Sequence, residues 1–247
     1  MRNLPKLSFL SALLLMTGLM SNCRRDYVVP PSGNDSIPQQ TGNNPENKRF
    51  IALGDSYTIG QSVPESDRFP AQTVAILRDS GINISQLKYI ASTGWTTLAL
   101  ENAINIEQPQ SQAPYSIVTL LIGVNDQYQT RDTTGYRERF TRLLNTSIAL
   151  AGNDRRRVFV LSIPDYSVTP FARGLDTAAI RRQIDWFNSI NRSVTLENNI
   201  SYTDITPSTR EAAIDKTLLA QDSLHPSGKE YAKWAARLAP LMKQVLQ

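Results

Sequence analysis

Residues 116–126 read SIVTLLIGVND and carry the clearest strand signal in the chain. Five of the first seven residues are apolar, and such a nearly continuous apolar run is typical of a strand covered on both faces. The run stops at Gly123, and the polar pair Asn125 and Asp126 follows closely. Strands buried on both faces occur in parallel sheets, so this stretch predicts an α/β protein.

Short apolar runs alternate with helical periodicity on both sides of this strand. The expected strands are 50–53, 88–91, 116–122, 158–163 and 200–205. Apolar residues at helical spacing predict helices at 69–80, 97–106, 136–148, 180–194 and 231–245. Ser227 and Glu230 have the spacing of a capping box at the start of the last helix. The alternation of strand and helix predicts a parallel sheet with helices on both faces.

The composition fits one globular domain. The chain has 247 residues, of which 40% are hydrophobic, enough for an α/β domain with a buried core. Its formal net charge of +4 falls to +2 without Arg2 and Lys6, which lie in a segment that we expect to be removed. The dense basic run at 155–157 stands directly before an apolar run and is interpreted as a solvated strand entrance. We therefore expect no nucleic-acid partner.

Cys23 is the only cysteine of the chain and His225 is the only histidine. A single cysteine excludes an intrachain disulfide, and one cysteine with one histidine cannot supply the usual nitrogen and sulfur ligands of zinc. The carboxylates show no spacing that suggests a metal site of their own, so we expect neither a metal nor another cofactor.

The N-terminus has the pattern of a secretory signal, because Arg2 and Lys6 precede an apolar run from Leu7 to Met20. This run is shorter than a membrane span and ends just before Cys23. It resembles a bacterial lipoprotein signal, which implies Cys23 as the lipidated residue. The alternative is an ordinary signal peptide with an incidental cysteine.

We therefore divide the chain into a lipoprotein signal peptide at 1–22, the lipidated cysteine with a flexible tether at 23–47, and a folded domain at 48–247. The tether is rich in Pro, Asn, Gln, Ser and Gly, which bury too little apolar surface to offset chain entropy. This arrangement predicts an extracytoplasmic protein, in the periplasm or on the cell surface, that is anchored to the membrane through a lipid on Cys23.

Polar motifs follow directly after several of the predicted strands. They are Gly54-Asp55-Ser56, Ser92-Thr93-Gly94 and Gly123-Val124-Asn125-Asp126. The carboxyl ends of parallel strands share one edge of the sheet, where ligands bind in such folds. We expect these motifs to gather there, with Ile163-Pro164-Asp165-Tyr166 after another strand shaping the pocket.

These motifs contain the groups that activate a serine. A serine hydroxyl is a poor nucleophile and needs a base to accept its proton. His225 is the only imidazole available to Ser56, and Asp222, three residues earlier, is placed to hydrogen-bond its other ring nitrogen. Attack on an ester carbonyl creates an oxyanion that needs donors. The candidate donors are the backbone N–H groups of Ser56 and Gly94 and the side-chain amide of Asn125.

Together the motifs resemble those of the SGNH (GDSL-type) hydrolase family, in the family's order. The resemblance spans the chain from Phe50 onward and rests on residues 54–60, Gly94, 123–126 and 222–226. It implies a flavodoxin-like three-layer α/β/α sandwich with a mostly parallel sheet. It also implies a serine hydrolase that cleaves carboxylic esters through a covalent acyl-enzyme.

The resemblance assigns a role to each residue of the predicted site. It implies Ser56 as the nucleophile, Asp222 and His225 as the base pair, and Ser56, Gly94 and Asn125 as the oxyanion donors. Thr58 stands where the Gly-x-Ser-x-Gly turn of α/β-hydrolases has its second glycine, which argues against that fold.

Other functions remain open at this point. One is a non-catalytic surface lipoprotein that binds a glycan or a partner protein, and another is an acyltransferase that uses a sugar alcohol. A glycosidase pair of Asp55 and Asp126 would leave Ser56 and His225 unexplained, so we interpret both carboxylates as hydrogen-bonding to loop amides.

The sequence does not decide among acylated glycans, lipid esters and small aryl esters as substrates. The three tryptophans are expected in the core or in the wall of a groove, and they are Trp95, Trp186 and Trp234.

Overall fold

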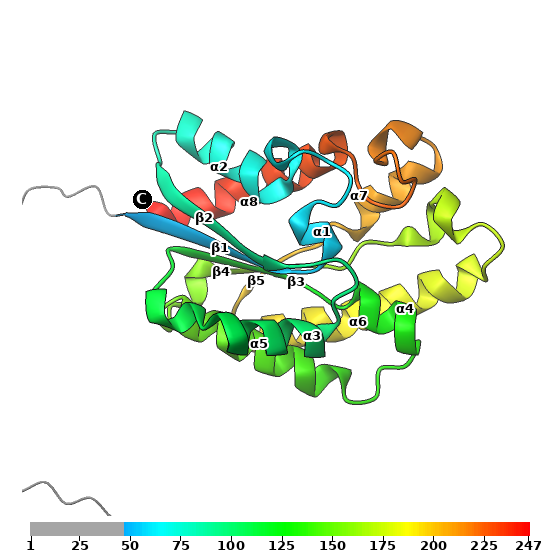
Figure 1. Ribbon diagram of the computed structural model, residues 1–247, viewed down its shortest axis with the longest axis horizontal. Helices are drawn as coiled ribbons and strands as arrows, with labels where there is room; N and C mark the ends of the chain where they lie inside the picture. Colours follow the sequence, from blue (N-terminus) through cyan, green and yellow to red (C-terminus); the bar gives the residue numbers. More distant parts are fainter. Residues whose placement is uncertain (1–46) are drawn as a thin grey trace, which may run out of the picture. The chain divides into compact units, whose positions relative to one another are not determined.

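The computed structural model describes residues 47–247, which form a five-stranded sheet with helices on both faces (Figure 1). The predictions for the signal peptide, for Cys23 and for the tether lie outside these residues, apart from Asn47 at the tether's end. Within residues 47–247, every helix is too short or too polar for a membrane span.

The sheet has the strand order β2-β1-β3-β4-β5, and every pair of neighbouring strands is parallel. Its strands are β1 (Lys48–Gly54), β2 (Ile84–Ala91), β3 (Ile117–Leu121), β4 (Val158–Leu161) and β5 (Ser201–Thr203). This is the flavodoxin-like order, so the predicted fold class is confirmed. The inner strands β3 and β4 are wholly buried, whereas the edge strand β2 is only partly buried.

Two layers of helices cover the sheet (Figure 1). One face carries α2 (Phe69–Asp79) and α8 (Gly228–Leu246), which pack against each other. The other face carries α3 (Thr97–Glu107), α5 (Tyr136–Leu150) and α6 (Thr177–Glu197), with α5 in contact with both neighbours. The short helices α1 (Ser56–Ile59), α4 (Val124–Thr130) and α7 (Thr206–Arg210) complete the fold.

Buried aromatic rings join the helices within each layer. In the first layer, Phe69 on α2 lies 5.8 Å from Trp234 on α8, measured between ring centroids. In the second layer, Tyr136 on α5 lies 4.5 Å from Phe187 on α6. A buried aromatic ring removes roughly 150–250 Å² from water, so these contacts explain which face of each helix turns inward.

The capping box predicted at the start of α8 is wrong. Ser227 is the N-cap residue, but its hydroxyl donates to the carbonyl oxygen of Thr217 instead of accepting from the helix. Glu230 is buried, and its Oε1 accepts hydrogen bonds from Ser208 and Trp234. Ser227 and Glu230 therefore hydrogen-bond to residues distant in the sequence or to Trp234, and neither side chain caps the helix.

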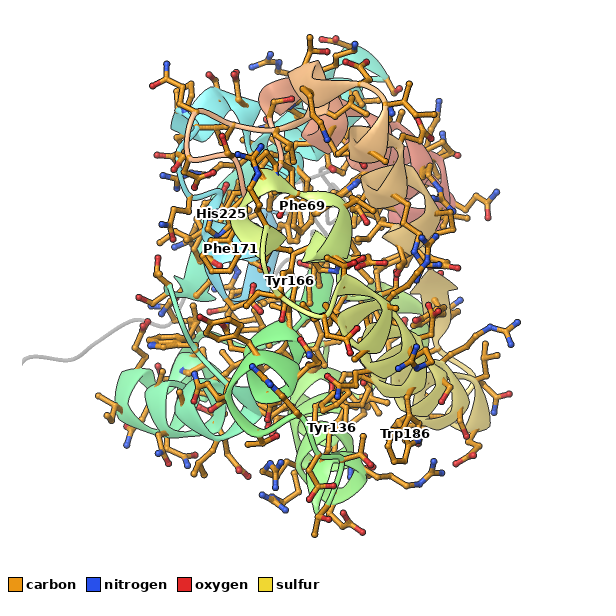
Figure 2. All side chains as sticks on the ribbon, turned by 90° about the vertical axis from the view of Figure 1, so that its right-hand side faces the viewer. Phe69, Tyr136, Tyr166, Phe171, Trp186 and His225 are labelled. Carbon is orange, nitrogen blue, oxygen red and sulfur yellow. The ribbon has the colours of Figure 1, made fainter. Side chains whose placement is uncertain are left out.

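The expectation for the tryptophans holds in part. Trp234 is fully buried and Trp95 packs against the core. Trp186 is 55% exposed on α6 and lies away from His225, so the expectation is wrong there (Figure 2). Its neighbours Ile184 and Phe187 take the inward positions of the helix.

Candidate active site

Two of the predicted motifs lie where the topology of the sheet reverses. The chain leaves β1 toward β2 on one side and returns to β3 on the other. In open α/β sheets, ligands bind beyond the carboxyl ends of the strands at this switch point. Ser56 follows β1 and Val124 and Asn125 follow β3, so both motifs stand there. Figure 2 looks onto this edge of the molecule.

Ser56 follows a tight turn at the end of β1 in which Gly54 has no room for a side chain. A Cβ added to Gly54 would clash with the hydroxyl of Thr58 and with the carbonyl oxygen of Leu121. Because Gly54 has no side chain, the end of β1 can approach β3 closely, and α1 can begin two residues later. Glycine is the residue that permits such a close approach.

Asp55 caps the one-turn helix that carries Ser56. Its Oδ1 accepts a hydrogen bond from the N–H of Tyr57 at 3.0 Å, and the helix ends at Gly60 with a left-handed φ of 64°. The first N–H groups of a helix have no acceptor within the helix. Ser56 is the first residue of α1, so its N–H is free of the helix and available to a ligand.

The Asp55 carboxyl is fully buried, and within the described residues its Oδ2 has no hydrogen-bond partner. Burial raises the pKa of Asp55 to about 8, the N–H of Tyr57 opposes this rise, and the charge of Asp126 adds to it. The carboxyl therefore holds a proton at neutral pH, and no full negative charge stands behind Ser56.

The free energy of unfolding is expected to fall with rising pH in the wild-type protein but not in the Asp55→Asn variant. Between about pH 4 and pH 8 the folded protein holds a proton on Asp55 that the unfolded chain has released, so the free energy of unfolding falls as pH rises. Asparagine is neutral throughout. Denaturant unfolding should show that, between pH 5 and pH 8, the free energy of unfolding of Asp55→Asn rises relative to that of the wild-type protein by at least about 1.4 kcal/mol, the value of one pKa unit. Parallel pH dependences of the two proteins would contradict this.

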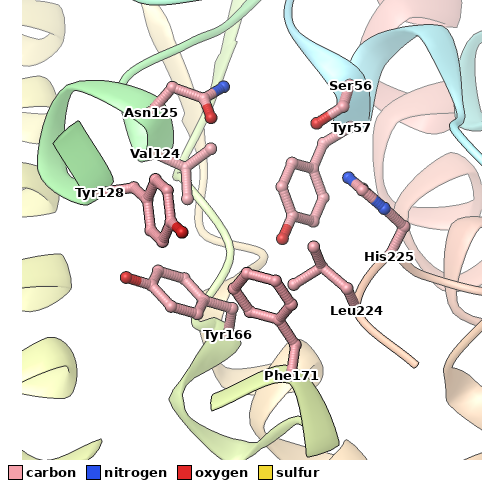
Figure 3. Close-up of a pocket in the computed structure, with 9 residues that line it drawn as sticks. All are labelled: Ser56, Tyr57, Val124, Asn125, Tyr128, Tyr166, Phe171, Leu224 and His225. Carbon is pink, nitrogen blue, oxygen red and sulfur yellow. The ribbon is translucent and has the colours of Figure 1, made fainter. Parts of the chain in front are cut away.

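His225 and Asp222 form the predicted pair. Nδ1 of the buried imidazole lies 2.6 Å from Oδ2 of Asp222, and Oδ1 accepts the N–H groups of Leu224 at 3.0 Å and His225 at 2.9 Å. Because Nδ1 is engaged by the carboxylate, Nε2 is the nitrogen left for another partner. Figure 3 shows the imidazole beside Ser56, and its ring packs 4.8 Å from that of Tyr57.

Ser62 is a neighbour of this pair that no sequence motif indicates. Its hydroxyl donates to Oδ2 of Asp222 at 2.7 Å. Partial burial raises the pKa of Asp222, but the hydrogen bonds from Ser62, His225 and two backbone N–H groups outweigh it and lower the pKa to about 2. Asp222 is therefore a carboxylate at neutral pH, so the carboxylate accepts and Nδ1 of His225 donates.

Asp126 holds the loop after β2 in place. Its Oδ2 accepts the N–H of Thr97 at 2.8 Å and its Oδ1 accepts the Thr97 hydroxyl at 2.6 Å. Arg139 on α5 stands 3.6 Å from the same carboxylate. Asp126 thus hydrogen-bonds the first amide of α3, and Asp55 hydrogen-bonds the amide of Tyr57 in α1. Both carboxylates make structural hydrogen bonds to backbone amides as expected, but these amides belong to helix N-termini and not to loops.

Helix α4 also fixes the segment that contains Gly94. The side-chain amide of Asn125 donates to the carbonyl oxygen of Trp95 at 3.0 Å, and that of Gln129 donates to the carbonyl oxygen of Gly94 at 3.2 Å. An asparagine amide has two hydrogens, so Asn125 keeps one for a ligand. Gly94 has a left-handed φ of 79°, and Gln129 holds its peptide beside α4.

A pocket of about 90 Å³ opens beside Ser56 (Figure 3). Of the predicted site residues, Ser56, Asn125 and His225 line it, whereas Asp222 stands behind His225 and Gly94 is not part of the lining. The other lining residues are Tyr57, Val124, Tyr128, Tyr166, Phe171 and Leu224. None of the nine is Asp, Glu, Lys or Arg, so the pocket favours uncharged groups.

Three aromatic rings form one wall of this pocket, which we call the aromatic wall: Tyr128, Tyr166 and Phe171. Their centroids lie 6.1–6.2 Å apart, and the rings come from α4 and from two single turns after β4. The Tyr166 hydroxyl donates to Gln127 at 2.9 Å, which fixes its ring. The sequence marked the segment that ends in Tyr166, but no pattern marked Tyr128 or Phe171.

Solved structures share this fold. A lipase/acylhydrolase from Enterococcus faecalis is 19% identical and covers 81% of this chain and 97% of its own, with a TM-score of 0.61. The esterase EstA from Pseudoalteromonas sp. is 16% identical over 80% and 93% of the two chains, with a TM-score of 0.54. An acetylxylan esterase from Geobacillus stearothermophilus is 18% identical over 79% and 94%, also with a TM-score of 0.54.

The family of the chain follows from its sequence. No curated protein matches it. The model of the GDSL-like lipase/acylhydrolase family matches residues 52–233, a range that contains every residue of the candidate active site. Because this match covers most of the chain, the protein belongs to the GDSL-like lipase/acylhydrolase family and is an ester hydrolase of that family.

Proposed function

We propose that this protein hydrolyses carboxylic esters through a covalent acyl-enzyme, with Ser56 as nucleophile and His225 as general base. The observation that carries the proposal is the hydrogen bond between Asp222 and Nδ1 of His225, because it leaves Nε2 facing the pocket that Ser56 lines. A triad is recognised by this geometry and by these roles, whatever the order of its residues in the chain.

The reaction proceeds in two balanced steps. Nε2 of His225 takes the hydroxyl proton of Ser56 while Oγ bonds to the ester carbon, and His225 then gives this proton to the departing alkoxide, so an alcohol leaves. A water molecule next bonds to the acyl carbon and gives a proton to His225. The bond between carbon and Oγ breaks, the acid leaves, and Ser56 regains its proton.

The oxyanion of each step needs donors that are already in place. The N–H of Ser56 and the second amide hydrogen of Asn125 meet this need, since the helix does not use the first and the Trp95 carbonyl takes only one hydrogen of the second. The N–H of Gly94 is the third proposed donor. The bonds from α4 to this loop support it, because they hold the Gly94 peptide next to Asn125.

A fluorophosphonate tests this proposal directly, because it forms a stable bond only with an activated serine. EstA of Pseudoalteromonas sp. is inhibited by monoethylphosphonate, which supports the choice of reagent. We expect the full chain to gain the mass of one phosphonyl group, on the peptide that contains Ser56. A folded protein that stays unlabelled would instead indicate a binding protein with the same fold.

The acyl acceptor is proposed to be water. Product analysis of the same reaction with a sugar alcohol added separates hydrolysis from acyl transfer, since only transfer yields a new sugar ester. Acylated glycans and lipid esters are the proposed natural substrates, in keeping with the extracytoplasmic, membrane-anchored location that the signal and Cys23 support.

A further inference from the structure

The aromatic wall and its neighbours give the pocket an apolar character. Val124, Phe171 and Leu224 have side chains of carbon alone, and three further lining residues are tyrosines, whose rings are mostly carbon. An alkyl group is therefore a better occupant than a sugar, whose hydroxyls would lose water without gaining enough hydrogen bonds. A carboxylate or ammonium group would find no partner of opposite charge in the lining.

The size of the pocket favours a short alkyl group. Its volume of about 90 Å³ is smaller than the roughly 150 Å³ of an apolar protein cavity that holds one benzene molecule. A chain of two to about four carbons fits such a space. Tyr166 is fixed by Gln127, and Phe171 packs against it, so the rings of the aromatic wall support one another.

We propose that this pocket binds the acyl part of the ester, and that the substrate is an ester of a short, uncharged acyl group such as acetyl to butyryl. The inference rests on the proposed function, since the acyl carbon is then bonded to Oγ of Ser56, which lines the pocket. The acyl chain starts inside the pocket, whereas the alcohol leaves past His225.

The experiment compares 4-nitrophenyl acetate, butyrate and hexanoate, which share one leaving group. The wild-type chain should prefer acetate and butyrate to hexanoate by at least about tenfold in kcat/KM, because a methylene that does not fit costs roughly 10-fold or more. Phe171→Ala removes one ring of the aromatic wall and should raise the ratio of hexanoate to acetate about tenfold, since each newly buried methylene is worth about fourfold. Phe171→Trp narrows the pocket and should lower the ratio of butyrate to acetate.

Trp186→Ala is the matched control, because this ring is also exposed but lies on α6, outside the pocket. It should keep the wild-type ratios. If both Phe171 variants hydrolyse acetate with unchanged ratios, the acyl pocket is wrong and ester hydrolysis stands. A wild-type chain that neither hydrolyses these esters nor reacts with the phosphonate overturns the proposed function itself.

A separate observation concerns Ser62, whose φ of 68° is unusual for a residue other than glycine. This conformation brings its hydroxyl to the same oxygen of Asp222 that holds His225, over a separation of 160 residues. The carboxylate then has a partner at each of four positions, two of them backbone N–H groups.

We infer that Ser62 is a positioning residue, which holds Asp222 in the orientation that His225 requires. Ser62→Gly removes the hydroxyl and suits the left-handed backbone, so it separates the hydrogen bond from backbone strain. We expect kcat and the rate of phosphonate labelling to fall together by about fivefold, with KM unchanged, the effect of one exposed hydrogen bond. Ser62→Ala should lose activity equally.

A purely structural role would leave the glycine variant as active as the wild-type protein, and that result would overturn the inference. Loss of activity in Ser62→Ala alone would assign the effect to the backbone and overturn it as well. Both results differ from a failure of the proposed function, because in that case the phosphonate would not label the wild-type chain either.

Discussion

Ser56→Ala is expected to lower kcat for ester hydrolysis by roughly 10⁴ to 10⁶-fold and to leave KM nearly unchanged, because the nucleophile is lost while the pocket stays. Ser56 lines the pocket, and alanine removes only its hydroxyl. The free energy of unfolding should therefore stay within about 0.5 kcal/mol of wild type. Steady-state kinetics and denaturant unfolding measure the two effects.

Ser66→Ala is the control for this experiment, since Ser66 is an exposed serine in the single 3₁₀ turn (Glu65–Asp67) after α1. It should retain full activity and label with the phosphonate. A Ser56→Ala protein that keeps more than about a tenth of the activity would show that another group attacks the ester, against the loss of several powers of ten that a nucleophile's removal causes.

Asp222→Asn is expected to lower kcat by about 10⁴-fold by imposing the wrong tautomer on His225. Oδ1 of Asp222 accepts two backbone N–H groups, so an asparagine must keep its oxygen there and turn its amide toward Nδ1. Nδ1 then has to accept, the ring proton moves to Nε2, and the imidazole no longer takes a proton from Ser56. The pH dependence of kcat/KM and the labelling rate report this loss.

Asp215→Asn provides a closely matched control. Asp215 also accepts a backbone N–H, that of Thr217, and its hydrogen bonds to Lys229 and Thr217 lower its pKa to about 2. Its partners lie outside the pocket, so the variant should hydrolyse esters at the wild-type rate. Equal losses in the two variants would mean that the carboxylate of Asp222 acts through loop stability alone.

Burial decides how much of the fold is readable from the sequence. β3 and β4 were predicted because both of their faces are covered, which requires a nearly continuous apolar run. β2 was predicted from residue 88 but begins at Ile84, because Ser85 and Gln86 at its start are exposed and polar. α1 and α4 are too short for any helical period to be visible.

The residues of the candidate site also fall into those that the sequence predicts and those that it does not. Ser56, Asn125 and His225 were found because each follows a strand or precedes a helix in a short motif, and the structure brings them to one pocket. Ser62 and Phe171 were missed, because Ser62 bonds to the distant Asp222, Phe171 packs on the distant Tyr128, and neither belongs to a periodic pattern. Their positions depend on tertiary packing, which a local pattern does not contain.

The origin of the pocket's walls has a consequence for how such a protein diverges. Ser56 and His225 come from the turn after β1 and the loop before α8, whereas Phe171 and Tyr166 come from two single turns after β4. Those turns contribute no residue to the pair of Asp222 and His225, so a substitution there alters the ring faces without removing a member of the pair. The acyl-group specificity of related proteins can therefore change by single substitutions in these turns while the catalytic residues are retained.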